Sequence, residues 1–390
     1  MKNVDEIKNC YGCGVCSIIC PVDIVKIELN CEGFYEPVIY EHDKCIDCQL
    51  CLSVCAFHND GVAMPDDKSG ENKSYATWSN NAEVRQFSSS GGTGFEIGKK
   101  LIEKGYVGCG VKYEPSEYRA KHFLTTSVHE YRQSMGSKYI QSYTVEAFSQ
   151  IEKGEKYLIT GAPCQIDSIR RYVKKKRIED NFILLDFFCH GVPSMLLWDK
   201  YINENENEIG KIKNASWRDK TAGWHDSYVV SLVGEHSSKK SKLSTGDLFC
   251  KMFLEDHCLG KACHENCKYK LESSAADIRI GDLWGQKYRD NESGVTGLIA
   301  FSETGINLVK ELSEKECTII EHPMDVVLDG QMAIPPQLKR SRGKVLSALK
   351  TTAPLKDIYI YKVFIPNFVP IVLNKIKWKL IKIWRRKIRK

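Results

Sequence analysis

Eight cysteines between Cys10 and Cys55 constrain this chain more than any other feature of the sequence. They form two copies of one spacing, C-x2-C-x2-C-x3-C. The first copy is Cys10, Cys13, Cys16 and Cys20, followed by Pro21, and the second is Cys45, Cys48, Cys51 and Cys55. Because thiolates are soft ligands, this spacing indicates a pair of 4Fe–4S clusters.

The spacing also predicts how the eight sulfur atoms divide between the two clusters. The first three cysteines of a copy converge on one cluster, and the fourth points at the other cluster. One predicted ligand set is Cys10, Cys13, Cys16 and Cys55, and the other is Cys45, Cys48, Cys51 and Cys20. This part of the chain resembles a bacterial-type two-cluster ferredoxin.

Zinc and disulfide bonds are the alternatives for these cysteines. Zinc sites usually pair two C-x2-C hooks, whereas each run here holds four cysteines. A disulfide framework needs an oxidising compartment, and the opening residues MKNVDEIKNC lack the apolar stretch of a secretory signal. The 17 cysteines in 390 residues therefore favour thiolate ligands in a reducing cytoplasm.

Changes in composition divide the chain into regions. Residues 1–65 are predicted to form an α+β ferredoxin-like module, in which residues 23–29 and 34–40 are short strands. Residues 66–74, within the polar and turn-rich stretch PDDKSGENKS, are interpreted as a linker. Residues 75–350 follow as a second domain, which is long enough to bury a core of its own.

A serine- and glycine-rich segment follows the linker. Residues 83–87 are predicted as a strand, and residues 95–104 as a helix that stops at Gly105. Between them lies SSSGGTG, from Ser88 to Gly94. Small residues before a helix let backbone N–H groups approach an anion, which is how many proteins bind phosphate. The segment matches neither the dinucleotide nor the Walker pattern, so a flexible loop is the alternative.

Two strand–turn–helix units come next. The first has the apolar strand 157–160 and the turn GAPCQ, and the second has strand 182–188 and a turn that ends at the helix cap Ser194. Continuous apolar strands alternating with helices predict an α/β sheet covered on both faces. Each unit places a cysteine, Cys164 or Cys189, at the carboxyl end of a strand, where such sheets bind ligands.

A third group of cysteines lies in the stretch HCLGKACHENCKY. It supplies three of the four ligands that a cubane cluster needs: Cys258, Cys263 and Cys267. Cys164 and Cys189 are both available as the fourth ligand. The alternative is a zinc site that recruits His257 or His264. The remaining cysteines are expected to be small buried residues: Cys31, Cys109, Cys250 and Cys317.

Six segments taken together resemble the beta-subunit family of coenzyme F420 hydrogenases and dehydrogenases, where F420 is a deazaflavin cofactor. They are SSSGGTGF (88–95), GSKYIQS (136–142), GAPCQ (161–165), DFFCHGVPS (186–194), WRDKTAGW (217–224) and CLGKAC…C…ADIRIGDLWG (258–285). They fall in the same order as in the family and cover roughly residues 75–310. A ferredoxin-like front end is a common addition in this family.

The resemblance implies an α/β flavin domain that holds FAD and a further 4Fe–4S cluster. By motif, the flavin would be held by Ser89, Ser90, Gly91, Gly92 and Thr93, with Lys138 as a cation near the flavin. The further cluster would draw its ligands from Cys164, Cys189, Cys258, Cys263 and Cys267. Two departures are visible. Cys263 and Cys267 are spaced C-x3-C where the family usually has C-x2-C, and GAPCQ replaces the more frequent GTPCQ.

The function implied by the resemblance and the N-terminal module is that of an iron–sulfur flavoprotein oxidoreductase. Electrons would pass from a redox partner protein through the N-terminal clusters and the third cluster to FAD, and then to a small-molecule acceptor, which is the deazaflavin coenzyme or another compound. A flavin can take one or two electrons, so it converts single electrons into a hydride. One alternative is a non-catalytic electron-transfer subunit of a larger redox complex, in a polysaccharide pathway like similar bacterial proteins. Another is a zinc-containing binding protein.

The C-terminal region differs from the rest of the chain. Residues 351–390 are predicted to be a basic amphipathic tail, and nine Lys or Arg with no acid lie between Asn374 and Lys390. The formal net charge of +6 therefore belongs to the tail and gives no reason to expect nucleic-acid binding. Such a tail can contact an anionic membrane surface or dock on a partner subunit. Its apolar stripe is Leu373, Ile376, Leu380, Trp384 and Ile388.

The sequence also sets expectations about location. No run of 18 apolar residues is present, so we expect no membrane-spanning helix. The chain is expected to be cytoplasmic, and its basic tail would place it at the inner face of a membrane as a peripheral protein.

Overall fold

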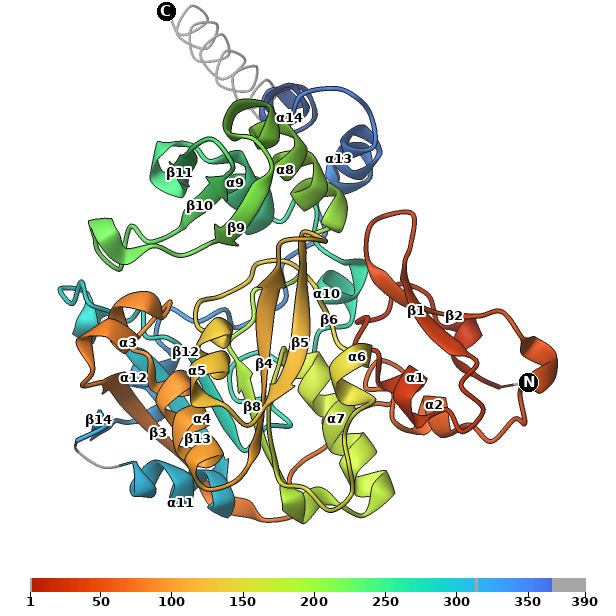
Figure 1. Ribbon diagram of the computed structural model, residues 1–390, viewed down its shortest axis with the longest axis vertical. Helices are drawn as coiled ribbons and strands as arrows, with labels where there is room; N and C mark the ends of the chain where they lie inside the picture. Colours follow the sequence, from red (N-terminus) through yellow and green to blue (C-terminus); the bar gives the residue numbers. More distant parts are fainter. Residues whose placement is uncertain (1, 313–314, 367–390) are drawn as a thin grey trace, which may run out of the picture.

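The structure, a computed structural model, describes residues 2–312 and 315–366 (Figure 1). Its largest sheet has nine strands, which are, from edge to edge, β14 (Cys317–Glu321), β3 (Lys68–Ser79), β13 (Thr296–Ser302), β12 (Ile278–Asp282), β8 (Phe182–Phe187), β7 (Tyr157–Thr160), β4 (Val107–Glu114), β5 (Arg119–Thr125) and β6 (Ser142–Tyr143). A three-stranded sheet holds β11 (Ser238–Lys242), β10 (Val229–Gly234) and β9 (Ile212–Ser216), and a two-stranded sheet holds β1 (Val25–Leu29) and β2 (Tyr35–Ile39).

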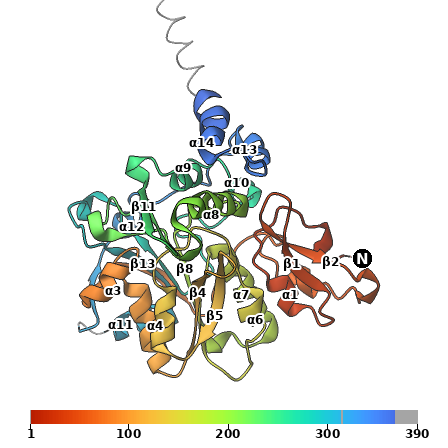
Figure 2. The same cartoon turned by 45° about the horizontal axis from the view of Figure 1, so that its top comes forward.

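Helices pack against all three sheets, so the chain has a mixed α/β fold (Figure 2). In the first half of the chain they are α1 (Val15–Ile19), α2 (Leu50–Ser53), α3 (Ala82–Phe87), α4 (Thr93–Glu103), α5 (Val128–Tyr131), α6 (Val145–Phe148) and α7 (Pro163–Lys176). In the second half they are α8 (Met195–Ile209), α9 (Leu248–Leu254), α10 (Lys261–Glu265), α11 (Glu303–Glu311), α12 (Met324–Leu328), α13 (Arg342–Leu349) and α14 (Leu355–Ile358).

The N-terminal residues fold around the β1–β2 hairpin and the two cysteine-bearing helices α1 and α2. The two strands predicted for residues 23–29 and 34–40 are confirmed, and they pair antiparallel with Leu29 opposite Tyr35. This part lies beside α6 and α7 (Figure 1). Buried apolar side chains of the hairpin and α1 belong to the same core as those of α6, α7 and β7. The N-terminal region is therefore packed onto the rest of the protein.

The centre of the large sheet is built from the apolar strands that the sequence predicts. Strands β4, β7, β8 and β12 run parallel, and β7 and β8 match the strands predicted for residues 157–160 and 182–188. Every residue of β13 is buried, as expected for an inner strand with both faces covered. Ser194 caps α8 by accepting a hydrogen bond from the backbone N–H of Leu196, which confirms the predicted helix start.

The interpretation of residues 66–74 as a linker is wrong for most of that stretch. From Lys68 onward the chain is in β3, which pairs antiparallel with β13 on one side and β14 on the other. Polar side chains are accommodated in this strand because they form hydrogen bonds with neighbouring backbone groups. Ser69 Oγ donates to the Phe301 carbonyl at 3.3 Å, and Ser74 Oγ donates to the His322 carbonyl at 2.7 Å. The body of the protein therefore begins before residue 75.

The strand predicted for residues 83–87 is also wrong, because these residues form helix α3. Asn81 begins the helix, and its side-chain oxygen accepts hydrogen bonds from the backbone N–H groups of Glu83 and Val84. A good N-cap outweighs the weak strand preference of a five-residue segment. The next helix agrees with its prediction, since α4 covers the stretch predicted at 95–104.

The three-stranded sheet and helices α8, α9, α13 and α14 form a second layer above the large sheet (Figure 1). Their core is rich in aromatic side chains, with Trp198 and Trp217 fully buried 4.7 Å apart. Leu355, Ile358 and Val363 pack into this core. The first part of the stretch predicted as a tail is therefore a docked helical segment. The basic amphipathic stretch from residue 367 onward lies outside the described residues.

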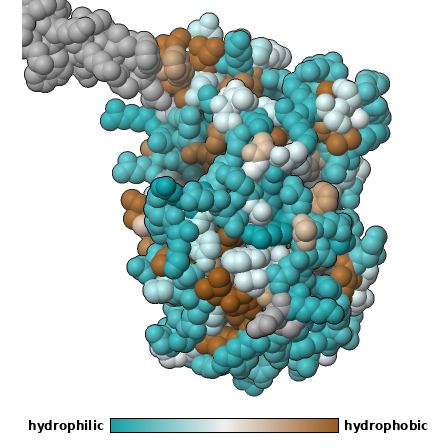
Figure 3. All heavy atoms as spheres, turned by 90° about the vertical axis from the view of Figure 1, so that its left-hand side faces the viewer, coloured by the Kyte–Doolittle hydropathy of each residue, from teal (hydrophilic) through white to brown (hydrophobic). Residues whose placement is uncertain are grey.

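The surface seen in Figure 3 is mostly hydrophilic, and its hydrophobic residues form separate patches. Large exposed apolar side chains of the described chain include Phe87, Ile320 and Ile334. Scattered residues of this kind are normal on soluble surfaces and need no partner. In the part of the chain that the structure describes, no helix has both the length and the apolar character to cross a bilayer.

Candidate metal and cofactor sites

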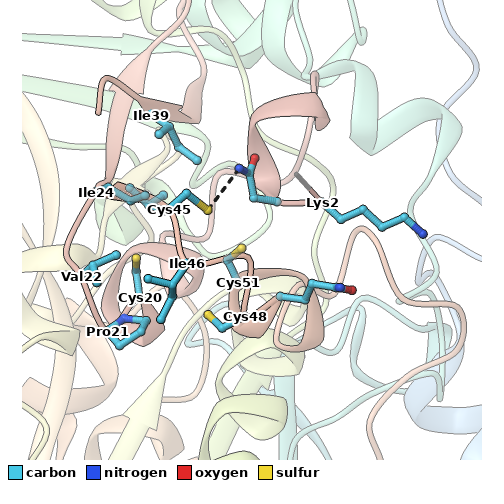
Figure 4. A pocket seen from close by; sticks show the side chains of 13 residues that line it. Lys2, Cys20, Pro21, Val22, Ile24, Ile39, Cys45, Ile46, Cys48 and Cys51 are labelled. Atoms are coloured by element: carbon cyan, nitrogen blue, oxygen red, sulfur yellow. Dashed lines mark hydrogen bonds between the residues drawn. The ribbon is translucent and has the colours of Figure 1, made fainter. Parts of the chain in front are cut away.

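Four cysteines surround a small pocket at the far side of the N-terminal region (Figure 4). We call Cys20, Cys45, Cys48 and Cys51 the outer site. Cys48 is exposed and Cys51 is buried, so the site opens to solvent on one side. Asn3 supports it, because its side-chain N–H group donates to Cys45 Sγ at 3.6 Å. The sequence predicts this grouping of sulfurs, including the exchange of Cys20 with the second run.

The other four cysteines line a second small pocket, which we call the inner site: Cys10, Cys13, Cys16 and Cys55. Its loop is tight because Gly12 adopts a positive φ of 64°, and a Cβ atom there would collide with Gln141 and with the Tyr35 carbonyl. The backbone N–H of Gly12 donates to Cys10 Sγ at 3.3 Å. Turns of this shape bring successive sulfur atoms to one point.

The electrostatics of the inner site favour a bound cation. Burial raises the pKa of Cys16 well above its usual value, and the charges of Cys13, Cys10 and Cys55 raise this pKa further. Burial and the charge of Cys13 likewise raise the pKa of Cys55 to about 11. Four thiolates in so small a space repel one another, and a positively charged metal centre is the usual compensation for such a group.

A third set of four cysteines meets where the parallel strands β7 and β8 end. Cys164 is at the start of α7, Cys189 follows β8, and Cys263 and Cys267 lie in and just after α10; we call them the third site. Burial raises the pKa of Cys164 well above its usual value, followed by the charges of its neighbours, including Cys189, Cys263 and Cys267. Burial, then the charge of Cys189, raises the pKa of Cys263 to about 12. Both strand-end cysteines therefore belong to one group.

Cys258, a predicted ligand of the third site, does not lie with this group. It is fully buried in the core of α8 and α9, and its Sγ donates to the Met252 carbonyl at 3.7 Å. Burial raises its pKa to about 12, and no other cysteine contributes to that shift. Next to it, Leu259 forms an isolated antiparallel bridge with Pro193.

The two histidines of the zinc alternative differ in their contacts. The ring nitrogens of His257 contact Ser341 and Glu255, whereas Nδ1 of His264 contacts the Pro336 carbonyl and its buried Nε2 has no hydrogen-bond partner. Among residues 2–312 and 315–366, no three His, Cys, Asp or Glu side chains are grouped to hold a single metal ion. A four-iron cube spreads its ligands over four metal atoms, so cluster cysteines lie farther apart than the ligands of one ion.

The remaining cysteines differ in their surroundings. Cys109, Cys250 and Cys317 are buried, as the sequence predicts. Cys31 is exposed, and its predicted burial is wrong. It lies in the turn that joins β1 and β2, where the chain points to solvent.

A cavity of about 520 Å³ lies beside the third site. Its wall includes Cys164 and Cys189. Polar groups of the wall come from the serine loop, which we define as Ser88–Gly92. Aromatic side chains complete the wall: Tyr139, Tyr228, Phe253 and Trp284. A cavity of this size, mainly apolar with a few polar groups, is typical of a site for a cofactor or a small molecule.

The serine loop leads into the N-terminus of α4, as the anion-binding prediction requires. Gly92 is the N-cap and has a φ of 89°, which favours glycine. Ser89, Ser90 and Gly92 line the cavity. The other two predicted residues face the sheet instead: the Gly91 N–H donates to Thr296 Oγ1 at 3.0 Å, and the Thr93 hydroxyl is 2.7 Å from Thr77 Oγ1.

Lys138, predicted as a cation near the flavin, lines the same cavity. Its Nζ donates to the carbonyl oxygens of Gln133 at 2.8 Å and Met135 at 2.9 Å. Burial lowers the pKa of Lys138 to about 7. A bound anion would stabilise its charged form.

Two buried cations beneath the serine loop were not predicted as site residues. Arg218 donates to the Ser89 carbonyl at 3.0 Å, and Lys220 donates to the carbonyls of Ser90 at 2.7 Å and Ser293 at 2.8 Å. Their positive charges lie under the loop and turn its carbonyl oxygens away from the cavity. The signal was available, because both residues belong to the motif WRDKTAGW.

Comparisons with known proteins give the family. Two family models describe the beta subunit of coenzyme F420 hydrogenase/dehydrogenase, one for its N-terminal part and one for its C-terminal part. The first matches residues 74–149 and the second matches residues 154–326, which together are more than half of the chain. The chain belongs to this family. As a hydrogenase/dehydrogenase beta subunit it is a redox protein, and the two matches include the serine loop, Lys138 and all four cysteines of the third site.

One solved structure similar to this family member comes from the F420-reducing NiFe hydrogenase complex of Methanosarcina barkeri, studied by xenon derivatization. The two chains are 14% identical with a TM-score of 0.46, over 77% of this chain and 90% of that chain. No curated protein matches this chain.

Proposed function

We propose that this protein is an iron–sulfur flavoprotein oxidoreductase. It would pass single electrons from a redox partner protein through three 4Fe–4S clusters to FAD, which reduces or oxidises a small-molecule acceptor. The observation that carries the proposal is that two cysteines of the third site, Cys164 and Cys189, line one cavity with the serine loop. In this arrangement the third 4Fe–4S cluster, which carries single electrons, would lie next to FAD, which can carry two.

The residues present fit three clusters. The inner, outer and third sites each offer four cysteines, and burial together with neighbouring cysteines raises the thiol pKa of Cys16 and of Cys164 well above the usual value. The chain's own part is to hold these sulfur atoms and to keep them partly covered from water. Burial and hydrogen bonds to the sulfur atoms set the potential of each cluster.

The cavity also fits a flavin. The N–H groups at the start of α4 and the Ser89 side chain would hold the phosphates, and Lys138 would supply a positive charge, whereas the Ser90 hydroxyl donates its proton to the Val295 carbonyl. The aromatic wall would pack against the ring system. When bound, FAD supplies the exchange between single electrons and a hydride. The acceptor would be the deazaflavin coenzyme or another compound that fits the open part of this cavity.

Metal and flavin analysis tests the proposal directly. The full chain is purified anaerobically, and iron, sulfide and flavin are counted per polypeptide. About twelve irons, from three four-iron clusters, and one flavin are expected. About eight irons and no flavin would contradict the oxidoreductase and leave only the N-terminal clusters.

Matched cysteine variants test the third site. Cys164→Ala should lower the count by about four irons, because one four-iron cluster loses a ligand. Cys258→Ala is the control. This cysteine is close in sequence to Cys263 but is buried in the core, so the variant should keep the full iron count. Loss of iron in the control with retention in Cys164→Ala would overturn the ligand assignment.

Reduction of an acceptor by the lone chain separates the enzyme from a non-catalytic subunit. The loaded protein is given a chemical reductant and the deazaflavin coenzyme, and the change in coenzyme absorbance is followed. Turnover is expected. Full cluster and flavin content with no reduction of any acceptor would favour an electron-transfer subunit that needs a partner for catalysis.

A further inference from the structure

A hydroxyl group from the body of the protein contacts a sulfur atom of the inner site. Ser168 Oγ lies 3.2 Å from Cys13 Sγ, and the two residues are far apart in the sequence. Ser168 is completely buried, so water does not compete for this contact. Ser168 Oγ also accepts a hydrogen bond from the backbone N–H of Ala56 at 3.2 Å. The hydroxyl therefore contacts the first cysteine run and the residue that follows the second run.

As a free thiol, Cys13 donates its proton to Ser168 Oγ, but with Cys13 bound to a cluster the direction of this hydrogen bond would reverse. A serine hydroxyl has one proton to donate and two lone pairs to accept with. The Ala56 N–H uses one lone pair, and a metal-bound thiolate at Cys13 has no proton to give. The Ser168 proton must then point at Cys13 Sγ. Hydrogen bonds to cluster sulfur atoms stabilise the reduced form, which carries more negative charge.

Ser168 is placed by the same helix that supplies a ligand of the third site. Cys164 and Ser168 are four residues apart on α7, so they lie on the same face in successive turns. One turn of helix and one hydrogen bond thus join the third site to the inner site.

The neighbouring contacts agree with this adjacency. Tyr11, between Cys10 and Gly12, lines both the inner pocket and the large cavity. Its ring lies 5.8 Å from that of Tyr269, whose hydroxyl donates to Asp167, the residue before Ser168. The outer site differs from the inner site in the origin of its side-chain hydrogen bond. The donor to Cys45 Sγ is Asn3, which belongs to the N-terminal region and not to the body.

We propose that Ser168 is a positioning residue that sets the potential of the inner cluster and couples it to the third site, so that the inner cluster is the one that exchanges electrons with the body. The proposal rests on the proposed function above. Cys13 and Cys164 would each help to hold one of the two clusters, and the two clusters, when bound, would supply one-electron transfer between the inner and the third site. No proton moves, because the hydroxyl keeps its proton throughout. The outer cluster is then the one that meets the external partner.

The test measures potentials rather than activity. The anaerobic holoprotein and the Ser168→Ala variant are titrated with a reductant, and the signals of the reduced clusters are followed by electron paramagnetic resonance. One of the three midpoint potentials should become more negative in Ser168→Ala, while the other two stay unchanged. The rate of flavin reduction after rapid mixing with reductant should fall in the same variant.

Two controls separate the hydroxyl from packing. Ser17→Ala removes another buried hydroxyl beside the first cysteine run, but that hydroxyl donates to the Val25 carbonyl at 2.6 Å and not to sulfur. It should leave all three potentials unchanged. The side chains introduced by Ser168→Thr and Ser168→Val have the same shape, and only threonine carries a hydroxyl. The affected midpoint potential should therefore be more negative in Ser168→Val than in Ser168→Thr. This pair serves if Ser168→Ala does not fold.

The outcomes distinguish this inference from the proposed function. A wild-type protein without cluster signals would overturn both. Clusters present in the wild type, with the same three potentials in Ser168→Ala and in the Thr and Val pair, would overturn the role of Ser168 and leave the proposed function standing. Equal shifts in the Thr and Val variants would assign the effect to packing and overturn it too.

Discussion

At the scale of single residues, one buried ion pair holds the wall of the third site. Asp186 and Arg279 form two hydrogen bonds, at 2.7 and 2.6 Å, and both side chains are completely buried. Arg279 also donates to the Leu271 carbonyl at 2.6 Å, in the segment next to Lys270. Lys270 in turn donates to the Cys189 carbonyl. The pair therefore keeps a ligand-bearing turn in place.

Removal of one partner of this pair should be costly. We expect Arg279→Met to lower the free energy of unfolding by about 3–5 kcal/mol, because a buried carboxylate loses its partner. The measurement is chemical denaturation of the purified chain. Lys26→Met is the control: its ion pair with Asp23 is exposed and should be worth about 1 kcal/mol or less. Equal costs for the two variants would contradict this prediction.

A buried histidine should make stability depend on pH. Burial lowers the pKa of His122 from 6.5 to about 4, and its Nε2 lies 3.1 Å from the Thr160 carbonyl. Between these two pH values the unfolded chain binds a proton that the folded chain does not, so stability falls as the pH falls from 6.5 to 4. With about 1.4 kcal/mol per pKa unit, the loss approaches about 3 kcal/mol.

Denaturation curves of the wild type and of His122→Gln at several pH values check this. The glutamine amide can still donate to Thr160 but does not titrate. The difference in stability between the two proteins should be constant above pH 6.5 and should shift in favour of the variant below it. Parallel curves down to pH 4 would show that His122 is not the group responsible.

Residue-scale roles were the hardest to predict from the sequence. The spacing of the first eight cysteines determines their grouping, because short loops allow few arrangements. The spacing around Cys258 does not say which way a side chain faces, and the packing of α8 and α9 turns it into the core. Ser168 gave no signal at all, because its contact with Cys13 joins two distant parts of the chain.

At the scale of elements, apolar strands and capped helices were predictable and polar strands were not. Strands β7 and β8 are short apolar runs, which predict inner strands directly. Strand β3 begins with Lys, Ser and Gly, so its residues look like a loop. It forms a strand because β13 and β14 provide hydrogen-bond partners on both edges. Long-range pairing of this kind outweighs local propensity.

The serine loop gives a prediction at this scale. Lys220→Met should lower the free energy of unfolding by about 1–3 kcal/mol, because the Ser90 and Ser293 carbonyls lose their buried donor. It should also weaken flavin binding about tenfold, the effect of about 1.4 kcal/mol. Denaturation and flavin titration measure these effects. Lys112→Met, a half-exposed lysine on β4, is the control. Unchanged flavin binding in Lys220→Met would contradict the prediction that Lys220 holds the serine loop in its binding conformation.

At the scale of the whole molecule, the N-terminal region and the body share a core. Side chains such as Val15 and Ile24 pack in the same cluster as Phe148 and Ile166. Hydrogen bonds cross the boundary as well, with the Tyr35 N–H donating to Gln141 at 2.9 Å and Thr144 donating to the Cys13 carbonyl at 2.8 Å. The sequence predicted two separate domains joined by a linker, because composition does not reveal contacts between regions.

This shared core predicts concerted unfolding. Peptides from residues 1–65 and from α6, α7 and β7 should lose protection against hydrogen exchange over the same range of denaturant, because these parts share one cluster of buried apolar side chains. Mass spectrometry of the loaded protein measures this. A lower midpoint for residues 1–65 than for the body would show that the N-terminal region unfolds on its own.

The position of β3 also bears on how the protein is made in the cell. Both partners of this strand, β13 and β14, are synthesised about 220 residues after it. At about 10 residues per second the ribosome needs roughly 20 s to supply the first of them. During that time β3 has two open edges, which are sites for pairing with other chains. The cysteines of the N-terminal region are exposed to oxidation over the same interval. If the proposed clusters are present, their insertion is therefore expected to follow release from the ribosome.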